Sequence, residues 1–238
     1  MKAFLYGVSL QCKLDIRSKT LLITCYIVPL LFFAIMGGIF TSAMPGAEYT
    51  LIQSITVFGV TMGALAGLPP SLVEIYSGDI KKVYKANGVP LYLGLVLTNI
   101  SAYIHLFIMS IILYIAAPLA FNARIPENPA RYFISLAVFI AVSLSIASVI
   151  GLALKDQARA SMFSIIVFVP STMLSGIMFP ASMLPKPFET IGKLFPASWG
   201  YKLMSESVFK FENLLPLILF FALAVVVCSI LLQRIDKY

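Results

Sequence analysis

The feature that most constrains this fold is a run of 38 residues without charge, residues 86–123, between Lys85 and Arg124. A membrane-spanning helix needs about 20 predominantly apolar residues to cross a hydrocarbon core of ~30 Å. Further apolar stretches near that length recur along the chain, of which 60% is hydrophobic and only 11% charged. Soluble domains contain about 25% charged residues. The sequence therefore predicts an all-α integral membrane protein with no room for a sizeable soluble domain.

We expect a single transmembrane domain, residues 1–238, with six spans. The uncharged run is too long for one helix of ordinary span length, so its span is placed within it, ending near Pro118. The six predicted spans cover residues 21–40, 51–68, 91–119, 132–154, 160–179 and 214–232.

Residues 1–19 fit an amphipathic helix lying in the membrane interface. At 100° per residue, one face is apolar and the opposite face is basic. Lys2, Lys13 and Arg17 lie on the basic face, and the apolar face holds Phe4, Leu5, Val8, Cys12 and Ile16. The alternative is a solvated basic leader.

Lys and Arg are distributed unevenly between the two sides that six spans define. The N-terminal segment, the 69–90 loop, the 155–159 turn and the C-terminal tail hold 11 of the 17 Lys and Arg, and the other three loops hold 6. Because basic loops stay inside, both termini are predicted to be cytoplasmic in a multi-pass protein of the cell (plasma) membrane. The net charge of +7 then reflects topology in the lipid bilayer and indicates no nucleic-acid partner.

The segment 69–90 lies between the second and third predicted spans, bracketed by Pro69-Pro70 and Pro90. A short charged helix held between two spans can receive a push from a soluble partner and pass it to both. We therefore predict that this segment couples the chain to a separate motor. Its charged residues are Glu74, Asp79, Lys81, Lys82 and Lys85.

The chain lacks a nucleotide site of the P-loop type. The closest fragment, residues 191–194, lacks the first glycine and the hydroxyl residue of GxxxxGK[ST]. The three cysteines, Cys12, Cys25 and Cys228, have no metal-binding spacing, so no metal is expected. If ATP powers transport, another subunit binds it.

His105 is the only histidine and lies in an apolar run. Intramembrane ionisable groups are costly and often functional, so one hypothesis is an intramembrane enzyme that uses His105. The alternative is a neutral imidazole hydrogen-bonded to a neighbouring helix, because no acidic or serine residue has helical spacing to it. Ser175 could be proposed as a partner, but the turn that exposes such a serine is missing.

No acidic residue falls in the centre of a predicted span, which weakens a proton- or sodium-coupled mechanism and favours an external energy source. A six-span chain rarely encloses a pathway alone, so we expect a dimer with the pathway on its two-fold axis. An apolar pathway would suit an amphipathic or lipid-like cargo. Candidate lining residues, each with ordinary helix packing as its alternative, are Phe32, Phe33, Thr56, Met62, Asn99, Thr172 and Met173.

Residues 180–200 contain four prolines yet remain apolar, so a continuous helix is excluded. Non-helical backbone at membrane depth is tolerated when it packs in protein or lines a cavity. We expect short re-entrant helices that form an outer lid, with Trp199 and Tyr201 as interfacial anchors. The alternative is a folded surface loop.

With these segments placed, nearly the whole chain resembles the permease subunits of type-2 ABC transporters, bacterial exporters of drugs, peptides, lipids and polysaccharides. Three stretches carry the resemblance. The first is the amphipathic N-terminal segment. The second runs from Glu74 through Gly78 to Pro90, and the third is Leu174–Pro180 with the prolines that follow.

The resemblance implies six spans per subunit, a second permease copy or paralogue, and two ABC-type ATPase subunits that bind ATP and Mg, so this chain would hold no cofactor. It implies that Glu74, Gly78, Asp79, Lys81, Lys82 and Lys85 lie at the ATPase-coupling surface. It also implies an outer gate at Ser175, Gly176, Phe179, Pro180, Leu184, Pro185 and Pro196. Many members have arginine beside the coupling glutamate where this chain has Ile75. The expected function is ATP-driven efflux of drugs, antimicrobial peptides or lipid-like molecules; a non-transporting membrane anchor of a signalling ATPase is a further alternative.

Overall fold

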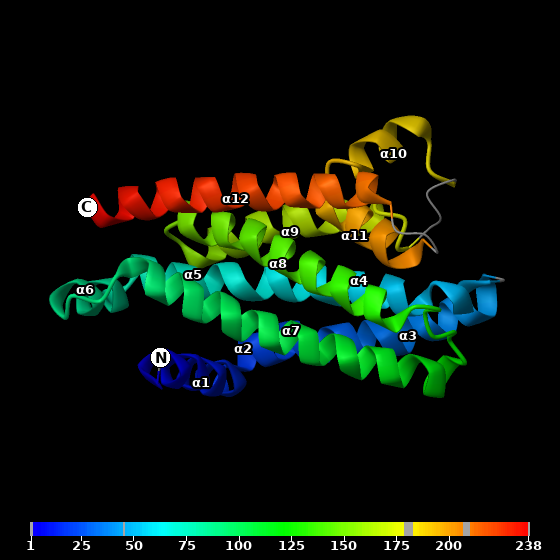
Figure 1. The fold of residues 1–238 in the computed structure, drawn as a ribbon, viewed down its shortest axis with the longest axis horizontal. Helices are drawn as coiled ribbons and strands as arrows, with labels where there is room; N and C mark the ends of the chain where they lie inside the picture. The colour runs from blue at the N-terminus through cyan, green and yellow to red at the C-terminus, as the bar shows by residue number, and fades with distance from the viewer. Residues whose placement is uncertain (1, 45, 179–182, 207–209, 238) are drawn as a thin grey trace.

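The computed structural model describes residues 2–44, 46–178, 183–206 and 210–237. Within these residues all regular structure is helical, and the long helices run side by side along the longest axis of the molecule (Figure 1). The prediction of an all-helical fold is confirmed for this part of the chain. The N-terminal half contains α1 Lys2–Arg17, α2 Lys19–Leu22, η1 Ile23–Ile27, α3 Val28–Ala43, η2 Ala47–Tyr49, α4 Leu51–Met62, η3 Gly63–Gly67, α5 Leu68–Ser77 and α6 Asp79–Ala86. The C-terminal half contains α7 Leu91–Phe121, α8 Pro129–Ala153, α9 Gln157–Met173, α10 Lys186–Gly192, α11 Pro196–Ser205 and α12 Phe211–Lys237.

Five helical stretches in the described residues are long and apolar enough to cross a membrane: Ile23–Ala43, Leu51–Ser77, Leu91–Phe121, Pro129–Ala153 and Phe211–Asp236. They coincide with five of the six predicted spans. The remaining predicted span is the fifth in chain order, 160–179. It begins in α9, which has 17 residues and is therefore about 25 Å long at 1.5 Å per residue. The six-span count stays a prediction.

The second stretch, Leu51–Ser77, forms the centre of the bundle. Its side chains are almost entirely buried, including Ile52, Ile55 and Leu72 at 0% exposure. The helix continues past Pro69-Pro70 because these prolines occupy the first turn of α5, directly after the π-helical turn η3. Gly63 in η3 permits the close contact, since a Cβ there would lie 2.4 Å from a Leu106 methyl carbon.

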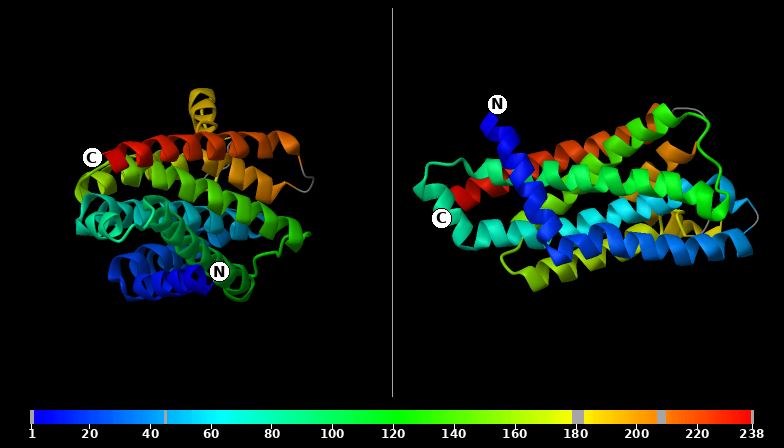
Figure 2. Two further views of the ribbon diagram at one scale, coloured as in Figure 1. Left: turned by 60° about the vertical axis from the view of Figure 1, so that its left-hand side comes forward. Right: turned by 90° about the horizontal axis from the view of Figure 1, so that it is seen from below.

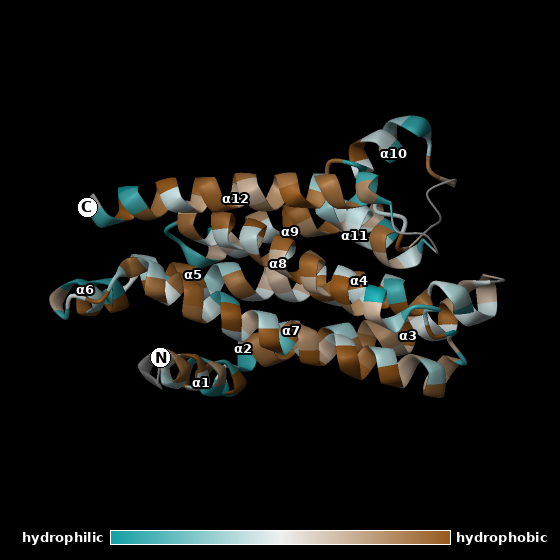
Figure 3. Ribbon diagram, viewed as in Figure 1, coloured by the Kyte–Doolittle hydropathy of each residue, from teal (hydrophilic) through white to brown (hydrophobic). Residues whose placement is uncertain are grey.

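The polar connections gather at the two ends of the bundle. Both termini and α6 lie at one end, which we call the charged end; it also holds the short 154–156 connection and the last turn of α12 (Figure 1). At the opposite end lie η2, the 122–128 loop, the 174–178 turn and α10 with the residues up to 196 (Figure 1). Figure 3 shows hydrophilic residues concentrated at both ends and hydrophobic residues between them. The four segments predicted to be cytoplasmic thus share one end.

Helix α1 crosses the bundle obliquely (Figure 2). The side that faces α7 carries Gly7 and the buried Asp15, whereas Leu5 and Ile16 are 61% and 57% exposed. Of the predicted apolar face, Phe4, Leu5 and Ile16 are exposed, whereas Val8 and Cys12 are half-buried, so part of this face stays free to contact lipid and part of it packs on the protein.

Candidate functional site

The charged end is organised by the elbow between α5 and α6. Gly78 separates the two helices, and a Cβ there would lie 2.6 Å from the Glu74 carbonyl oxygen. Only glycine avoids that backbone contact, so the turn depends on Gly78. The Tyr76 hydroxyl donates a buried hydrogen bond of 2.7 Å to the Leu91 carbonyl, which fixes α5 to the first residue of α7.

The C-terminal end of α6 is closed by a glycine cap. Gly88 has a left-handed φ of 64°, and the backbone N–H of Val89 donates to the Tyr84 carbonyl at 2.9 Å. Pro90 then adopts an extended conformation as the residue before α7. The predicted coupling segment, 69–90, is divided by Gly78: residues up to Ser77 continue the second membrane-length stretch, because Pro69-Pro70 lie in the first turn of α5. Only α6 is a separate short helix, and it is held at both of its ends.

The outer surface of α6 is accessible. Lys82 Nζ lies 2.8 Å from Asp79 Oδ1, and their side chains are 81% and 89% exposed. The hydrogen bond from Lys82 lowers the pKa of the Asp79 carboxyl and raises the pKa of the Lys82 ammonium, so both stay charged at neutral pH. Ile80 and Val83 are also exposed, which gives α6 an apolar patch beside its charges.

Lys85 links α6 to the C-terminal helix. Its ammonium donates a hydrogen bond to the Asp236 carbonyl oxygen and lies 3.7 Å from Oδ1 of the same residue. This contact brings together two segments that are 151 positions apart in the sequence. Glu74 is exposed nearby on α5, so five of the six predicted coupling residues carry charge on one end of the molecule.

A cleft of about 640 Å³ opens beside this elbow, between α5, α6, the C-terminal turn of α8 and the end of α12. No carboxylate lines it among the described residues. Its five cationic residues are Lys81, Lys82, Lys85, Lys155 and Arg234. All charged side chains that line this cleft are therefore positive, and we call it the basic cleft.

The opposite end holds the predicted outer gate. Helix α9 ends at Met173, and the chain turns through Ser175, whose hydroxyl donates to the Thr172 carbonyl at 3.0 Å, and Gly176, with a φ of 85°. Phe179 and Pro180 lie outside the described residues. Leu184 is half-buried and Pro185 precedes α10, while Pro196 is the first residue of α11.

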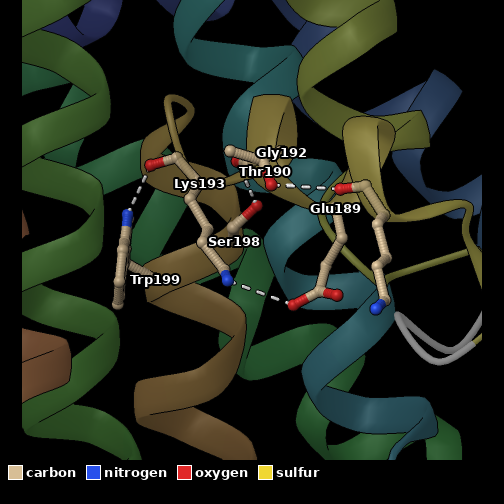
Figure 4. A network of polar contacts seen from close by, with 7 residues as sticks. Glu189, Thr190, Gly192, Lys193, Ser198 and Trp199 are labelled. Carbon is tan, nitrogen blue, oxygen red and sulfur yellow. Dashed lines mark hydrogen bonds and ion pairs between the residues drawn. The ribbon is translucent and has the colours of Figure 1, made fainter.

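Two short helices occupy the proline-rich segment, so the prediction that it cannot be one continuous helix is confirmed. Figure 4 shows the contacts that join them: the Ser198 hydroxyl donates to the Gly192 carbonyl at 2.6 Å, and the Trp199 indole donates to the Lys193 carbonyl at 2.7 Å. Lys193 also pairs with Glu189 at 3.1 Å. Helix α10 projects away from the long helices (Figure 1) and leaves Phe188 and Leu194 exposed. Whether these helices re-enter a membrane stays a prediction.

The predicted pathway residues make the following contacts within this single chain, and their role in a pathway stays a prediction. Phe32 stacks on Phe58 with ring centroids 3.4 Å apart, and Phe33 packs edge-on against Phe121. These contacts are within the bundle. Four of the others are placed as follows: Thr56 bonds to the Tyr132 hydroxyl at 2.8 Å, Thr172 bonds to the Phe168 carbonyl, Asn99 bonds to Ser148, and Met173 is 38% exposed. Met62 is half-buried against the core.

Two buried polar contacts fasten the N-terminal region to α7. Nδ1 of His105 lies 2.8 Å from the Tyr26 hydroxyl, while its Nε2 has no partner among the described residues. One helical turn away, the Ser101 hydroxyl bonds to the buried Asp15 carboxylate. His105 is therefore hydrogen-bonded to a neighbouring helical segment, as one of the two alternatives for this residue expects. Asp15 was missed because the residue pattern alone does not reveal which side of α1 meets the bundle.

No group of three or more His, Cys, Asp or Glu side chains in the described ranges could hold a metal ion. The family model described as ABC-2 type transporter matches residues 3–209, which is most of the chain and includes both α6 and the 174–205 region. No match is found among curated proteins.

Proposed function

The chain belongs to the ABC-2 type transporter family, and from this premise we propose that it is the permease subunit of an ATP-driven exporter. Two separate ATPase subunits would bind ATP and Mg, and a second permease copy would complete the pathway. The cargo would be an amphipathic small molecule, a peptide or a lipid-like molecule. The protein would be a multi-pass protein of the plasma membrane with six spans and both termini in the cytoplasm.

The observation that carries the proposal is the position of α6. It lies beyond the membrane-length helices and exposes Ile80 and Val83 beside Lys82. It contacts α12 through Lys85 and directly follows α5, whose Tyr76 bonds to the first residue of α7. A partner that presses on α6 would therefore act on spans two, three and six through short contacts. An exposed apolar patch rimmed by charge is typical of a protein interface.

In the proposed cycle, ATP binding closes the two ATPases, which push α6 and α1. The first, second and fifth spans tilt, and the cavity on the two-fold axis opens outward past the 180–198 lid. The described residues of that lid, α10 and the first turn of α11, are joined to each other by the hydrogen bonds of Ser198 and Trp199, so they can move as one unit.

The proposal is tested by replacing Lys81, Lys82 and Lys85 together with alanine. The variant should lose most cargo transport and most cargo-stimulated ATPase turnover while its amount in the membrane stays unchanged, because Lys82 and Lys85 are exposed, Lys81 is half-buried at the rim of the cleft, and none of the three lies in the core. The control replaces two exposed cations of the opposite end that lie outside the predicted lid, Arg124 and Lys210, and should transport normally. Full transport activity of the α6 variant would show that these lysines do not couple the chain to the ATPases.

The membrane anchor of a signalling ATPase gives a different outcome in the same experiment. Such a chain would co-purify with an ATPase whose turnover no cargo stimulates, in the unmodified protein as well as in the variant. An intramembrane enzyme would depend on His105 and not on α6.

A further inference from the structure

A second cavity lies on the outer side of the bundle, between α7, α8 and α12. Its volume is about 460 Å³, and its lining is apolar apart from a few small polar groups. The main polar pair, Asn99 and Ser148, satisfies itself: the Asn99 amide donates to the Ser148 hydroxyl at 3.0 Å, and that hydroxyl donates to the Leu144 carbonyl at 2.8 Å. No buried side-chain nitrogen or oxygen of this cavity lacks a partner among the described residues, and most of the lining is apolar, so an apolar occupant fits it.

The length of the cavity matches one leaflet of a bilayer. Along α7 its lining extends from Tyr92 to Tyr103, and along α12 from Phe221 to Leu232. Eleven residues of rise correspond to about 16 Å, roughly half of a ~30 Å hydrocarbon core. Tyr92, Val96 and Val225 are exposed, so the cavity opens outward from the bundle rather than towards its centre.

The apolar cavity and the basic cleft of the charged end follow each other along the same helix faces. On α8, Leu144 and Ser148 line the apolar cavity, and Leu152, four residues further, lines the cleft. On α12 the spacing is four, three, four and three along one face: Phe221, Val225, Cys228 and Leu232 line the cavity, and Ile235 lines the cleft.

The cations of the cleft are not all neutralised by the protein. Lys82 pairs with Asp79 and Lys85 with Asp236. Lys81, Lys155 and Arg234 form no ion pair with a described residue, and the nearby Asp156 carboxylate accepts a hydrogen bond from the Arg159 backbone at the start of α9. Of these three unpaired cations, Lys155 follows α8 and Arg234 lies on α12, the two helices whose faces the apolar cavity and the cleft share.

We propose that this composite groove binds an anionic phospholipid, with its phosphate at Lys155 and Arg234 and an acyl chain between α7, α8 and α12. The positive side chains of the cleft favour an anionic headgroup. The apolar cavity has the length of one leaflet, which suits an acyl chain. The cavity shares Asn99 with the predicted pathway residues, and the cleft shares its α6 lysines with the predicted coupling surface. Lys155 and Arg234 belong to neither set, and lipid binding to the purified chain involves neither cargo nor ATPase, so failure of this proposal is distinguishable from failure of the proposed function.

The test uses the full chain, purified alone in mild detergent and titrated with phosphatidylglycerol or with phosphatidylcholine of the same acyl chains. Intact-protein mass spectrometry counts the bound lipids. Phosphatidylglycerol should bind first, at one copy per chain. Replacing Lys155 and Arg234 with glutamine should weaken its binding by about fivefold for each cation removed and leave phosphatidylcholine unchanged. The matched control, Lys202→Gln with Lys210→Gln, removes the same charge at the opposite end and should bind like the unmodified chain.

A second variant tests the acyl cavity. Val225→Trp places a bulky ring in the groove from an exposed position, so the fold is retained, and it should weaken both phospholipids by about the same factor. Equal binding of the two headgroups by the unmodified chain, or unchanged lipid binding in Val225→Trp, would overturn the proposal. Displacement of phosphatidylglycerol by millimolar inorganic phosphate would assign the cations to a free anion and overturn it as well.

Discussion

The Tyr26 hydroxyl lies 2.8 Å from Nδ1 of His105, between η1 and α7, and His105 is 4% exposed. A buried polar group that loses its partner costs about 1–3 kcal/mol. Tyr26→Phe keeps the ring and removes the hydroxyl, so it should lower the free energy of unfolding by about that amount. Cargo transport per folded complex should stay within about twofold, because hydrogen bonding here positions helices. Thermal unfolding in detergent and transport in vesicles measure the two effects.

The control for this substitution is Tyr6→Phe, at a side chain that is 71% exposed, which should change neither quantity. If Tyr26→Phe or His105→Ala instead abolished turnover while the unfolding temperature stayed the same, His105 would have a chemical role. That result would favour the intramembrane enzyme.

Along α7, three residues spaced by four meet the N-terminal region in order: Leu97 faces Gly7, Ser101 bonds to Asp15, and His105 bonds to Tyr26. The residue pattern predicted the helix at 1–19 and the absence of acids from span centres. It could not predict that Asp15 is buried, because that depends on which face of α1 meets a helix about 80 residues away in sequence. The residue pattern therefore predicts that a helix forms here, whereas the contacts that the helix makes with α7 depend on how the bundle packs.

Among the short elements of the opposite end, α10 is fixed by a close backbone contact. A Cβ at Gly192 would lie 2.3 Å from the Leu174 carbonyl oxygen, an atom that cannot move without displacing the end of α9. Gly192→Ala should therefore separate α10 from the 174–176 turn, destabilise the protein by about 1–3 kcal/mol and impair transport. Thermal unfolding and transport in vesicles measure both.

Gly38→Ala is the matched control, since a Cβ at Gly38 meets only one Phe121 carbon at 3.9 Å, an ordinary van der Waals distance. It should leave stability within about 0.5 kcal/mol, because an added methyl group there needs no rearrangement. Equal stability of the two variants would show that α10 does not depend on the Leu174 contact.

At the scale of elements, composition and proline positions predicted most of the fold. The uncharged run 86–123 contains a single 31-residue helix, and the prolines at 185, 187 and 196 start short helices instead of continuing α9. Pro69-Pro70 was harder to interpret, because a proline pair can end a helix or occupy its first turn. The helix continues past the proline pair because the residues from α4 through η3 are buried at the centre of the bundle. The sequence alone does not reveal that burial, since it arises only when the helices pack together.

For the whole molecule, the distribution of charge and the arrangement of helices agree. The N-terminal segment, α6, the 154–156 connection and the end of α12 gather at one end, and they hold most of the basic residues. Basic residues near span ends favour the cytoplasmic side. This end is the one predicted to be cytoplasmic, so it is where the ATPases of the proposed function would contact α6.

The predicted fifth span, 160–179, is the remaining test of this topology, since α9 has 17 residues and is followed by the 174–178 turn. We predict that single cysteines at exposed positions 127 and 186 are labelled by an impermeant maleimide from outside intact cells, and that cysteines at 87 and 155 are labelled only in inverted vesicles. Cys12 is replaced by serine in all variants, while Cys25 and Cys228 are buried. If α9 did not cross the membrane, positions 155 and 186 would react from the same side, and the chain would have five spans with its termini on opposite sides. Opposite labelling of 155 and 186 requires a crossing between them, and α9 is the helix that connects them.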